Sequence, residues 1–311
     1  MSGSVPSDVW LSIPVLALLG LCVGSFLNVV IHRLPLMLER QWWQDVAHQL
    51  ADLESWRRVF GSKAKPAAEL QRSSEALSGA ITALPRLGLA KPASRCPACG
   101  HQIKWHENIP LLSWLRLKGR CSACGARISA RYPLVELLTA ALFAGVAWRF
   151  GPQPATLLWC GVVAVLVALA GIDWDTTVLP DLLTLPLLWA GLIASALGWV
   201  ALPLPAALWG AVAGYLSLWS VYWLFKLTTG KEGMGFGDFK LMGALGAWLG
   251  WQMIVPILLG ASIIGAVVGI AMKMNQSLRE GRYVPFGPFL AGAGIAVLLL
   301  GEPRVLGWLG W

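Results

Sequence analysis

The chain has 311 residues, of which 57% are hydrophobic and only 13% are charged, and its mean hydropathy is +0.64. Soluble globular domains carry about 25% charged residues, so this composition excludes an ordinary soluble protein and indicates an integral membrane protein. The 18 tryptophans and 34 glycines agree, because tryptophan favours membrane interfaces and glycine permits close helix packing.

The first apolar run extends from Val9 to Ile31 and is followed directly by His32 and Arg33. A cleaved signal peptide carries its basic residues before the apolar stretch, whereas here only Asp8 precedes it. We therefore expect a retained transmembrane helix.

From residue 133 onward the chain is almost wholly apolar. Further apolar runs occupy 133–150, 155–172, 182–201, 204–225, 239–251, 253–272 and 287–301. Together with the first run they predict an all-α polytopic membrane protein with about eight transmembrane helices. Only Trp251 and Gln252 separate 239–251 from 253–272, so this pair forms either two short helices or one broken segment.

Basic residues are concentrated in the segment 32–131, which holds 16 of the 24 lysines and arginines but only seven acidic residues. Short loops downstream are basic as well, at Lys226, Lys231, Lys240, Lys273, Arg279 and Arg282. The positive-inside rule then predicts a large cytoplasmic loop and both termini outside. We expect contact with membrane lipid and no nucleic-acid partner, because the aromatic residues of this segment are not interleaved as stacking platforms.

The polar segment after the first helix should begin with one helix from Glu39, interrupted at Gly61 and Pro66, and continue as a looser stretch. Its glycine, proline and alanine content predicts a linker over 78–94. The resulting domain prediction is a first transmembrane helix at 1–32, a cytoplasmic domain at 33–131, and a membrane core at 132–311.

Four cysteines form two matched C-x₂-C pairs, at Cys96, Cys99, Cys121 and Cys124. Each pair can present two thiolates to one tetrahedral ion, and the spacing suits a cytoplasmic zinc ribbon over 96–131, inserted between the first two membrane helices. A disulfide framework is disfavoured in a reducing cytosol, and a redox pair explains only half of the pattern. Four cysteines would fill the coordination sphere, so the zinc should be structural.

Two aspartates lie at the ends of apolar runs: Asp173 ends one run and Asp238 opens another. A carboxylate at the centre of a membrane helix costs roughly 2.5–3.5 kcal/mol, so its presence indicates a function. By the predicted topology both lie at the cytoplasmic edge and can face each other. Two carboxylates that share a site hold one proton and polarise a water molecule, which is the chemistry of aspartic proteases.

Other aspartates nearby leave alternatives open. Asp175 can be a solvated residue or can replace Asp173 as the catalyst, while Asp181 is interpreted as a helix cap. Three alternating glycines, Gly233, Gly235 and Gly237, precede Asp238 and would let an extended peptide backbone approach its carboxylate.

Taken in order, these residues resemble the type IV prepilin peptidase family, bifunctional leader peptidases and N-methyltransferases. The resemblance covers nearly the whole chain and rests on the segments GSFLNVVIHRLP (24–35), WHENIPLLSW (105–114), GRC (119–121), RYPLVELL (131–138), IDWD (172–175), LPD (179–181) and GFGDFK (235–240).

The resemblance implies catalysis by Asp173 and Asp238, zinc binding by the four ribbon cysteines, and 132–311 as a membrane aspartic peptidase core. It implies that the substrates are type IV prepilins and pseudopilins, which are cut after a glycine that ends a basic leader. Methylation of the new N-terminus with S-adenosylmethionine follows, in type IV pilus assembly or type II secretion. No G-x-G-x-x-G donor fingerprint is present; Gly119 either permits approach of a ligand or forms a turn.

Two other classes of protein remain as alternatives. One is a polytopic transporter whose carboxylates bind protons or cations, which would leave the glycines before Asp238 unexplained. The other is a non-catalytic assembly scaffold that uses the ribbon to bind a cytoplasmic partner.

Overall fold

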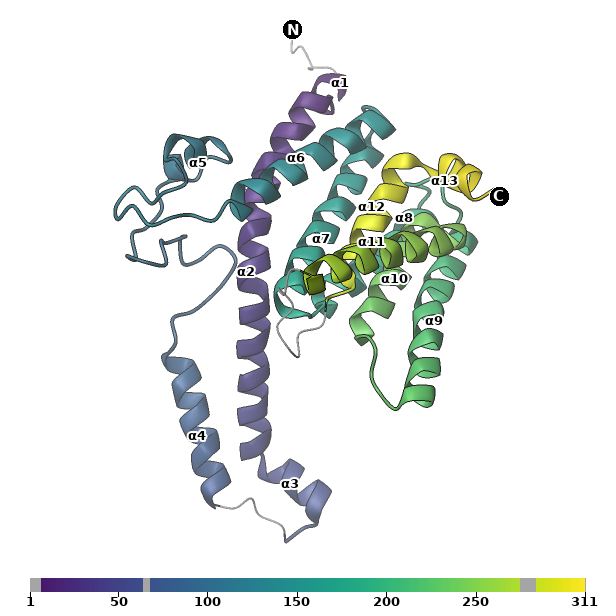
Figure 1. The fold of residues 1–311 in the computed structure, drawn as a ribbon. Helices are drawn as coiled ribbons and strands as arrows, with labels where there is room; N and C mark the ends of the chain where they lie inside the picture. Colours follow the sequence, from purple (N-terminus) through teal and green to yellow (C-terminus); the bar gives the residue numbers. More distant parts are fainter. Residues whose placement is uncertain (1–6, 64–67, 275–283, 311) are drawn as a thin grey trace. The chain divides into compact units, whose positions relative to one another are not determined.

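A computed structural model describes residues 7–63, 68–274 and 284–310 of the chain (Figure 1). Over these ranges the chain forms helices and irregular segments without a strand, as the all-α prediction requires. The helices are α1 (Ser7–Trp10), α2 (Ile13–Ala51), α3 (Leu53–Phe60), α4 (Ala68–Ala83), η1 (Trp105–Glu107), α5 (Leu112–Arg116), α6 (Arg131–Phe150), α7 (Pro154–Thr176), α8 (Asp181–Ala196), α9 (Leu204–Thr229), α10 (Phe236–Leu249), η2 (Trp251–Met253), α11 (Ile254–Met274), α12 (Gly287–Leu300) and α13 (Glu302–Leu309).

Every predicted apolar run forms a helix, but not every helix is long enough to cross a bilayer. In the described part of the chain five helices are long and apolar enough, or six if α12 and α13, bent by 107°, count as one span. Helices α8 and α10 have only 16 and 14 residues, whereas a spanning helix needs about 20 residues. The predicted number of about eight transmembrane helices is therefore not confirmed.

The segment 239–272 forms two helices and not one broken helix. Helix α10 ends at Leu249, and its C-cap Gly250 has a positive φ of 85°, a conformation that glycine adopts without strain. The short η2 follows and leads directly into α11, so the pair is separated by a sharp change of direction (Figure 1).

The polar part after the first membrane segment is more helical than the sequence suggested. Helix α2 continues without a break past His32 to Ala51, and α4 covers much of the stretch expected to be loose. The prediction of a linker from residue 78 was wrong up to residue 83, because the Ala, Glu and Leu content of α4 favours a helix despite Gly79. The buried Ser74 hydroxyl also donates to the Ala47 carbonyl at 2.6 Å.

The chain divides into two compact units, one formed by residues 29–107 and one by the remaining described residues. In the smaller unit, Arg40 and Arg33 of α2 donate to the carbonyl oxygens of Pro85 and Gly88, at 2.9 Å each, so the segment after α4 returns along α2.

Two residues that contributed to the predicted orientation, Arg279 and Arg282, lie outside the described residues.

Helix α10 is the centre of the larger unit. It is hydrophobic around its whole circumference, and all residues from Leu241 to Trp248 are buried, as expected for a helix enclosed by others. Its neighbours are α8, α9 and α12 (Figure 1). This enclosure fixes the position of Asp238, which lies in its first turn.

Glycines allow α9 and α10 to approach very closely. A methyl group added at Gly246 would overlap the backbone carbonyl of Gly210, and one added at Gly214 would lie 2.5 Å from the carbonyl oxygen of Met242. Membrane helices associate through such small residues because backbones can then make direct van der Waals contact. The crossing of α9 and α10 therefore depends on the absence of side chains at these positions.

Substitution of Gly246 tests this packing. Gly246→Ala should lower the free energy of unfolding by about 1–3 kcal/mol through overpacking. Gly292→Ala in α12 is a matched control, because no atom lies within 4 Å of the added methyl group. Thermal unfolding in detergent measures both variants; equal melting temperatures would show that the crossing does not require glycine.

Candidate functional site

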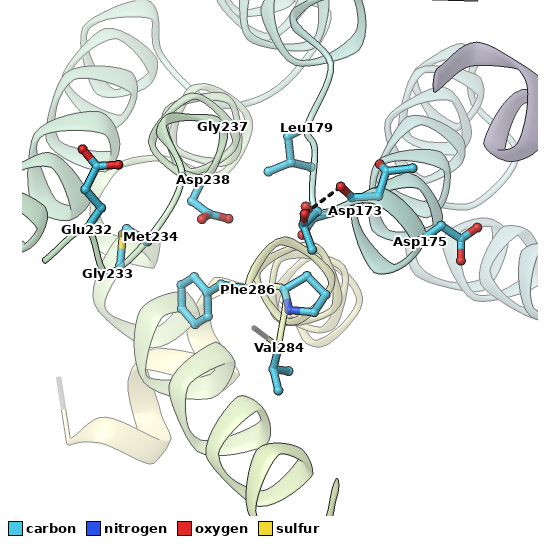
Figure 2. Close-up of a pocket in the computed structure, with 14 residues that line it drawn as sticks. Asp173, Asp175, Leu179, Glu232, Gly233, Met234, Gly237, Asp238, Val284 and Phe286 are labelled. Carbon is cyan, nitrogen blue, oxygen red and sulfur yellow. Dashed lines mark hydrogen bonds between the residues drawn. The ribbon is translucent and has the colours of Figure 1, made fainter. Parts of the chain in front are cut away.

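A pocket of about 370 Å³ opens at one end of the larger unit (Figure 2). Its walls come from the C-terminal turn of α7, the connector to α8, the glycine-rich loop before α10, and the residues that precede α12. The lining residues are Asp173, Asp175, Thr176, Thr177, Leu179, Glu232, Gly233, Met234, Gly235, Gly237, Asp238, Val284, Pro285 and Phe286.

The pocket contains two deeply buried carboxylates, those of Asp173 and Asp238. Their residues are 5% and 7% exposed, and they come from separate helices, the last turns of α7 and the first turn of α10. Both side chains face the pocket (Figure 2). Residues that are 65 positions apart in the numbering are thus brought into one cavity.

A backbone amide holds one of these carboxylates. The Gly287 N–H, at the N-terminus of α12, donates to Asp173 Oδ2 at 3.0 Å. A methyl group added at Gly287 would lie 2.5 Å from the same oxygen. Only glycine therefore allows this backbone to approach the carboxylate so closely, and the first turn of a helix is a favourable place for an anion.

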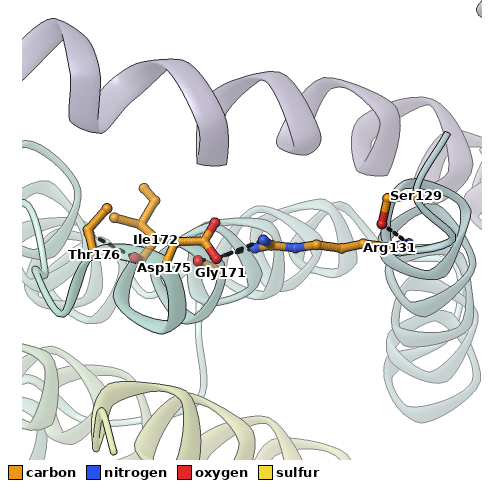
Figure 3. A network of polar contacts seen from close by, with 6 residues as sticks. All are labelled: Ser129, Arg131, Gly171, Ile172, Asp175 and Thr176. Carbon is orange, nitrogen blue, oxygen red and sulfur yellow. Dashed lines mark hydrogen bonds and ion pairs between the residues drawn. The ribbon is translucent and has the colours of Figure 1, made fainter. Parts of the chain in front are cut away.

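Asp175, which the sequence left as an alternative to Asp173, has a different environment. Its side chain is 34% exposed, and its Oδ1 lies 2.7 Å from the guanidinium of Arg131 (Figure 3). Arg131 also donates to the Gly171 carbonyl at 3.4 Å. Asp175 lines the edge of the pocket but points away from its centre (Figure 2), so burial distinguishes Asp173 from Asp175.

Asp181 does not cap a helix through its side chain, and that interpretation was wrong. The N-cap residue of α8 is Pro180, and no side-chain capping bond is present. Instead both carboxylate oxygens of Asp181 accept from Lys240 Nζ, at 2.6 and 2.8 Å. The cause is the position of α10, which places Lys240 opposite the start of α8.

The three glycines before Asp238 have different surroundings. A methyl group at Gly237 would lie 2.7 Å from Leu179 Cβ, and one at Gly233 would lie 2.9 Å from the ring of Phe225. At Gly235 the nearest such atom is 4.0 Å away. Close packing within the protein thus accounts for Gly233 and Gly237, while only Gly235 leaves open space beside its Cα.

The fourth carboxylate of the lining, that of Glu232, belongs to an exposed ion pair. Its Oε1 accepts from Lys226 Nζ at 2.9 Å and lies 3.3 Å from the Tyr222 hydroxyl. The hydrogen bond from Lys226 is the main cause that lowers the pKa of Glu232 below its ordinary value. Glu232 therefore stays ionised and is not suited to donate a proton.

Sequence reasoning missed Leu179 and the segment Val284–Gly287. The available signal was the pair of prolines around Phe286-Gly287, directly before an apolar run. Irregular backbone at membrane depth is tolerated only where it is buried in protein or lines a cavity, so two prolines at the start of an apolar run indicate a candidate site.

Two similar turns carry the cysteine pairs. In the first, Cys96 N–H donates to the His101 carbonyl at 2.9 Å, and in the second Cys121 N–H donates to the Ala126 carbonyl at 2.8 Å. The glycines that follow the pairs, Gly100 and Gly125, have φ values of 72° and 70°. Such positive values favour glycine, which adopts them without strain.

The four cysteine thiols can hold one metal ion. Their sulfurs, from Cys96, Cys99, Cys121 and Cys124, all lie within 4.8 Å of one another. Four sulfurs bound to one zinc ion at ~2.3 Å would lie about 3.8 Å apart. The cluster therefore fits a tetrahedral all-sulfur site with small adjustments.

Gly119 forms a turn packed against an aromatic ring. Its φ is 65°, and a methyl group there would lie 2.9 Å from the ring of Trp114. The Trp114 carbonyl accepts from Gly119 N–H at 2.9 Å. Of the two roles left open by the sequence, this geometry favours the turn.

Together the fold and the site define a multi-pass α-helical membrane protein with paired buried carboxylates. Residues 18–150 match the bacterial peptidase A24 N-terminal domain, and residues 160–270 match the type IV leader peptidase family. The chain belongs to the type IV leader peptidase family.

Curated relatives are similar over almost their whole length. The chain is 50% identical to the prepilin leader peptidase/N-methyltransferase of Aeromonas salmonicida, covering 94% of this chain and 92% of that protein. It is 50% identical to the protein of the same name from Stutzerimonas stutzeri, covering 94% of this chain and 91% of that protein. It is 48% identical to the one from Pseudomonas aeruginosa, covering 92% of this chain and 89% of that protein. No solved structure matches.

Metal removal tests the cysteine cluster. Because a structural zinc site contributes on the order of 10 kcal/mol to local folding, chelation should make the segment 96–131 sensitive to limited proteolysis. Cys99→Ser should bind less zinc, measured by elemental analysis. Cys22→Ser, which changes an exposed cysteine of α2, is the control and should bind as much zinc as wild type. Unchanged protease resistance after complete chelation would contradict a structural role.

Proposed function

We propose that this chain is a membrane aspartic endopeptidase that removes the leader peptide of type IV prepilins and pseudopilins, and then N-methylates the new N-terminal residue. The observation that carries the peptidase assignment is the pair Asp173 and Asp238, two buried carboxylates from separate helices in one pocket. The names of the relatives support the substrate class and the methylation.

Peptide hydrolysis by such a pair requires one proton between the two carboxylates. The ionised carboxylate takes a proton from water as the water oxygen attacks the scissile carbonyl carbon, and the protonated carboxyl donates to the carbonyl oxygen. The tetrahedral intermediate then collapses, the C–N bond breaks, and the leaving amine takes a proton from the pair. The Gly287 amide keeps Asp173 oriented toward the pocket throughout this sequence.

The position of the pair argues against a transporter. A proton or cation path needs polar groups distributed across the membrane, but Asp173 and Asp238 both lie at helix ends on one side of the bundle. The third buried carboxylate among the described residues, Glu136, accepts the Leu111 N–H at 2.7 Å and thus has a structural partner. A scaffold would need neither the pocket nor the burial of two aspartates.

The location of the pocket suits a substrate whose apolar segment lies in the bilayer. We infer that the protein resides in the bacterial inner membrane, in contact with its lipid, and that the basic segment 33–131 is cytoplasmic. The core 132–311 then presents the aspartates at the cytoplasmic edge, where a basic leader would remain in water.

The methyltransferase activity is proposed from the names of the relatives. Zinc is proposed as a structural ion held by Cys96, Cys99, Cys121 and Cys124. S-adenosylmethionine, as the methyl donor, would supply a transferable methyl group to the new amine. Gly119 gives no support to a donor site, because Trp114 fills the space beside it.

Conversion of either aspartate to the isosteric amide tests the peptidase assignment. Asp173→Asn and Asp238→Asn should each abolish cleavage, because the pair then lacks one titrating carboxyl, while the protein stays folded. A full-length prepilin is incubated with enzyme and S-adenosylmethionine and then analysed by mass spectrometry. Only the wild-type enzyme should give a mature pilin, heavier by one methyl group than the unmethylated product. Undiminished cleavage by either variant would remove that residue from the mechanism.

The role of the Gly287 amide has a test of its own. Gly287→Ala would press a methyl group onto Asp173 Oδ2, so the cleavage rate should fall about 100-fold, as expected for a displacement of about 1 Å. Gly292→Ala in the same helix meets no neighbour within 4 Å and should cleave at the wild-type rate. Equal rates for the two variants in the same assay would refute the predicted contact.

A further inference from the structure

The side chain of Leu179 lies between the two elements that hold the aspartates. It packs against Gly237, the residue before Asp238, where an added methyl group would lie 2.7 Å from Leu179 Cβ. It also packs against Gly287, the residue that binds Asp173, where an added methyl group would lie 3.2 Å from Leu179 Cδ1. Leu179 is only 8% exposed, and it is located between Asp238 and Asp173 in the view of Figure 2.

The short connector that carries Leu179 is itself held at both ends. At its start, Thr177 has a φ of 54° and donates its N–H to the Asp173 carbonyl at 2.8 Å. Thr177 is the C-cap of α7, which ends at Thr176 in the same turn as the aspartate. At its end, Asp181 is bound by Lys240 of α10 through both carboxylate oxygens. Lys240 lies only two residues after Asp238, so this ion pair joins the connector to the turn that carries the second aspartate.

We propose that Leu179 is a positioning residue for the reaction of the proposed peptidase: its side chain is the spacer that sets the separation of Asp173 and Asp238, and the Asp181–Lys240 pair holds this spacer in place. Although Leu179 lines the pocket, its proposed action is on the backbones of Gly237 and Gly287. This inference rests on the proposed function for its kinetic test but not for its structural test.

Truncation of the spacer should affect the chemical step more than substrate binding. Leu179→Ala should lower kcat for prepilin cleavage about 10- to 100-fold, because small displacements of reacting groups have effects of this size, with little change in KM. Leu179→Met, which nearly conserves volume, should restore most of kcat. A loss confined to KM, or no rescue by methionine, would overturn the proposal.

Leu187→Ala in α8 is the matched control, because Leu187 is 6% exposed and does not line the pocket. Both truncations should lower the melting temperature in detergent, but only Leu179→Ala should lower kcat. Equal kcat values for the two alanine variants would show that Leu179 has only a packing role.

The ion pair requires a double-mutant comparison. Lys240→Met and Asp181→Asn should each lower kcat, and the double variant should be no slower than the slower single variant if the residues act as one unit. Lys240→Arg, which keeps the charge, should retain most of the activity. Arg58→Met, which breaks the exposed Arg58–Glu54 pair in α3, is the control for loss of a surface ion pair. Additive losses of kcat in the double variant would contradict the proposal that the Asp181–Lys240 pair holds Leu179 in place.

A measurement without substrate separates this proposal from the proposed function. In an Asp173→Cys/Asp238→Cys enzyme, a short bifunctional thiol reagent should link the two positions, identified by peptide mass spectrometry. Added Leu179→Ala should reduce the yield of this link, whereas added Leu187→Ala should not. An unchanged cross-link yield refutes the spacer role of Leu179 even if the enzyme cleaves prepilin. A reduced yield supports that role even if the wild-type enzyme cleaves no prepilin.

Discussion

Burial of Asp173 and Asp238 among apolar helices is the constraint on which the arrangement of the larger unit depends. Buried carboxylates are unfavourable unless hydrogen-bond donors or helix termini face them. Here the N-terminus of α12 supplies an amide to Asp173, and Asp238 lies in the first turn of α10. The other acidic residues near the pocket are paired with cations instead: Asp175 with Arg131, Asp181 with Lys240, and Glu232 with Lys226. The two buried aspartates thus remain as the pair that can share a proton.

Close helix packing turns this local requirement into a property of the whole unit. Helix α10 is too short to span a bilayer, yet its enclosure by neighbouring helices fixes the position of Asp238 in its first turn. The contact of Gly246 with Gly210 sets how near α9 comes, and the contact of Gly237 with Leu179 sets how near the connector to α8 comes. Each of these contacts is between a glycine backbone and a neighbouring element, so each permits little displacement without overlap.

The sequence predicted the elements of the site better than their contacts. Apolar runs located the helices, and the spacing of the cysteines predicted the cluster, because both signals are local. Three other features depend on atoms that are distant along the chain: the amide of Gly287 at Asp173, the partner of Asp181, and the packing of Leu179. Helix α4 was missed for another reason, since its helix-forming residues are interspersed with serine and glycine, which are typical of a linker.

The central claim is that the scissile bond of a prepilin meets Asp173 and Asp238 in this pocket. The most direct test is to place a photoreactive amino acid beside the cleavage site of a prepilin, irradiate it with the Asp238→Asn enzyme, and map the cross-links by mass spectrometry. The account predicts cross-links to the lining of the pocket, in the α7–α8 connector (Thr176, Thr177 or Leu179), in the loop before α10 (Glu232–Gly235 or Gly237) or at Val284–Phe286. Cross-links confined to the cysteine segment 96–131, with none in the pocket, would contradict it.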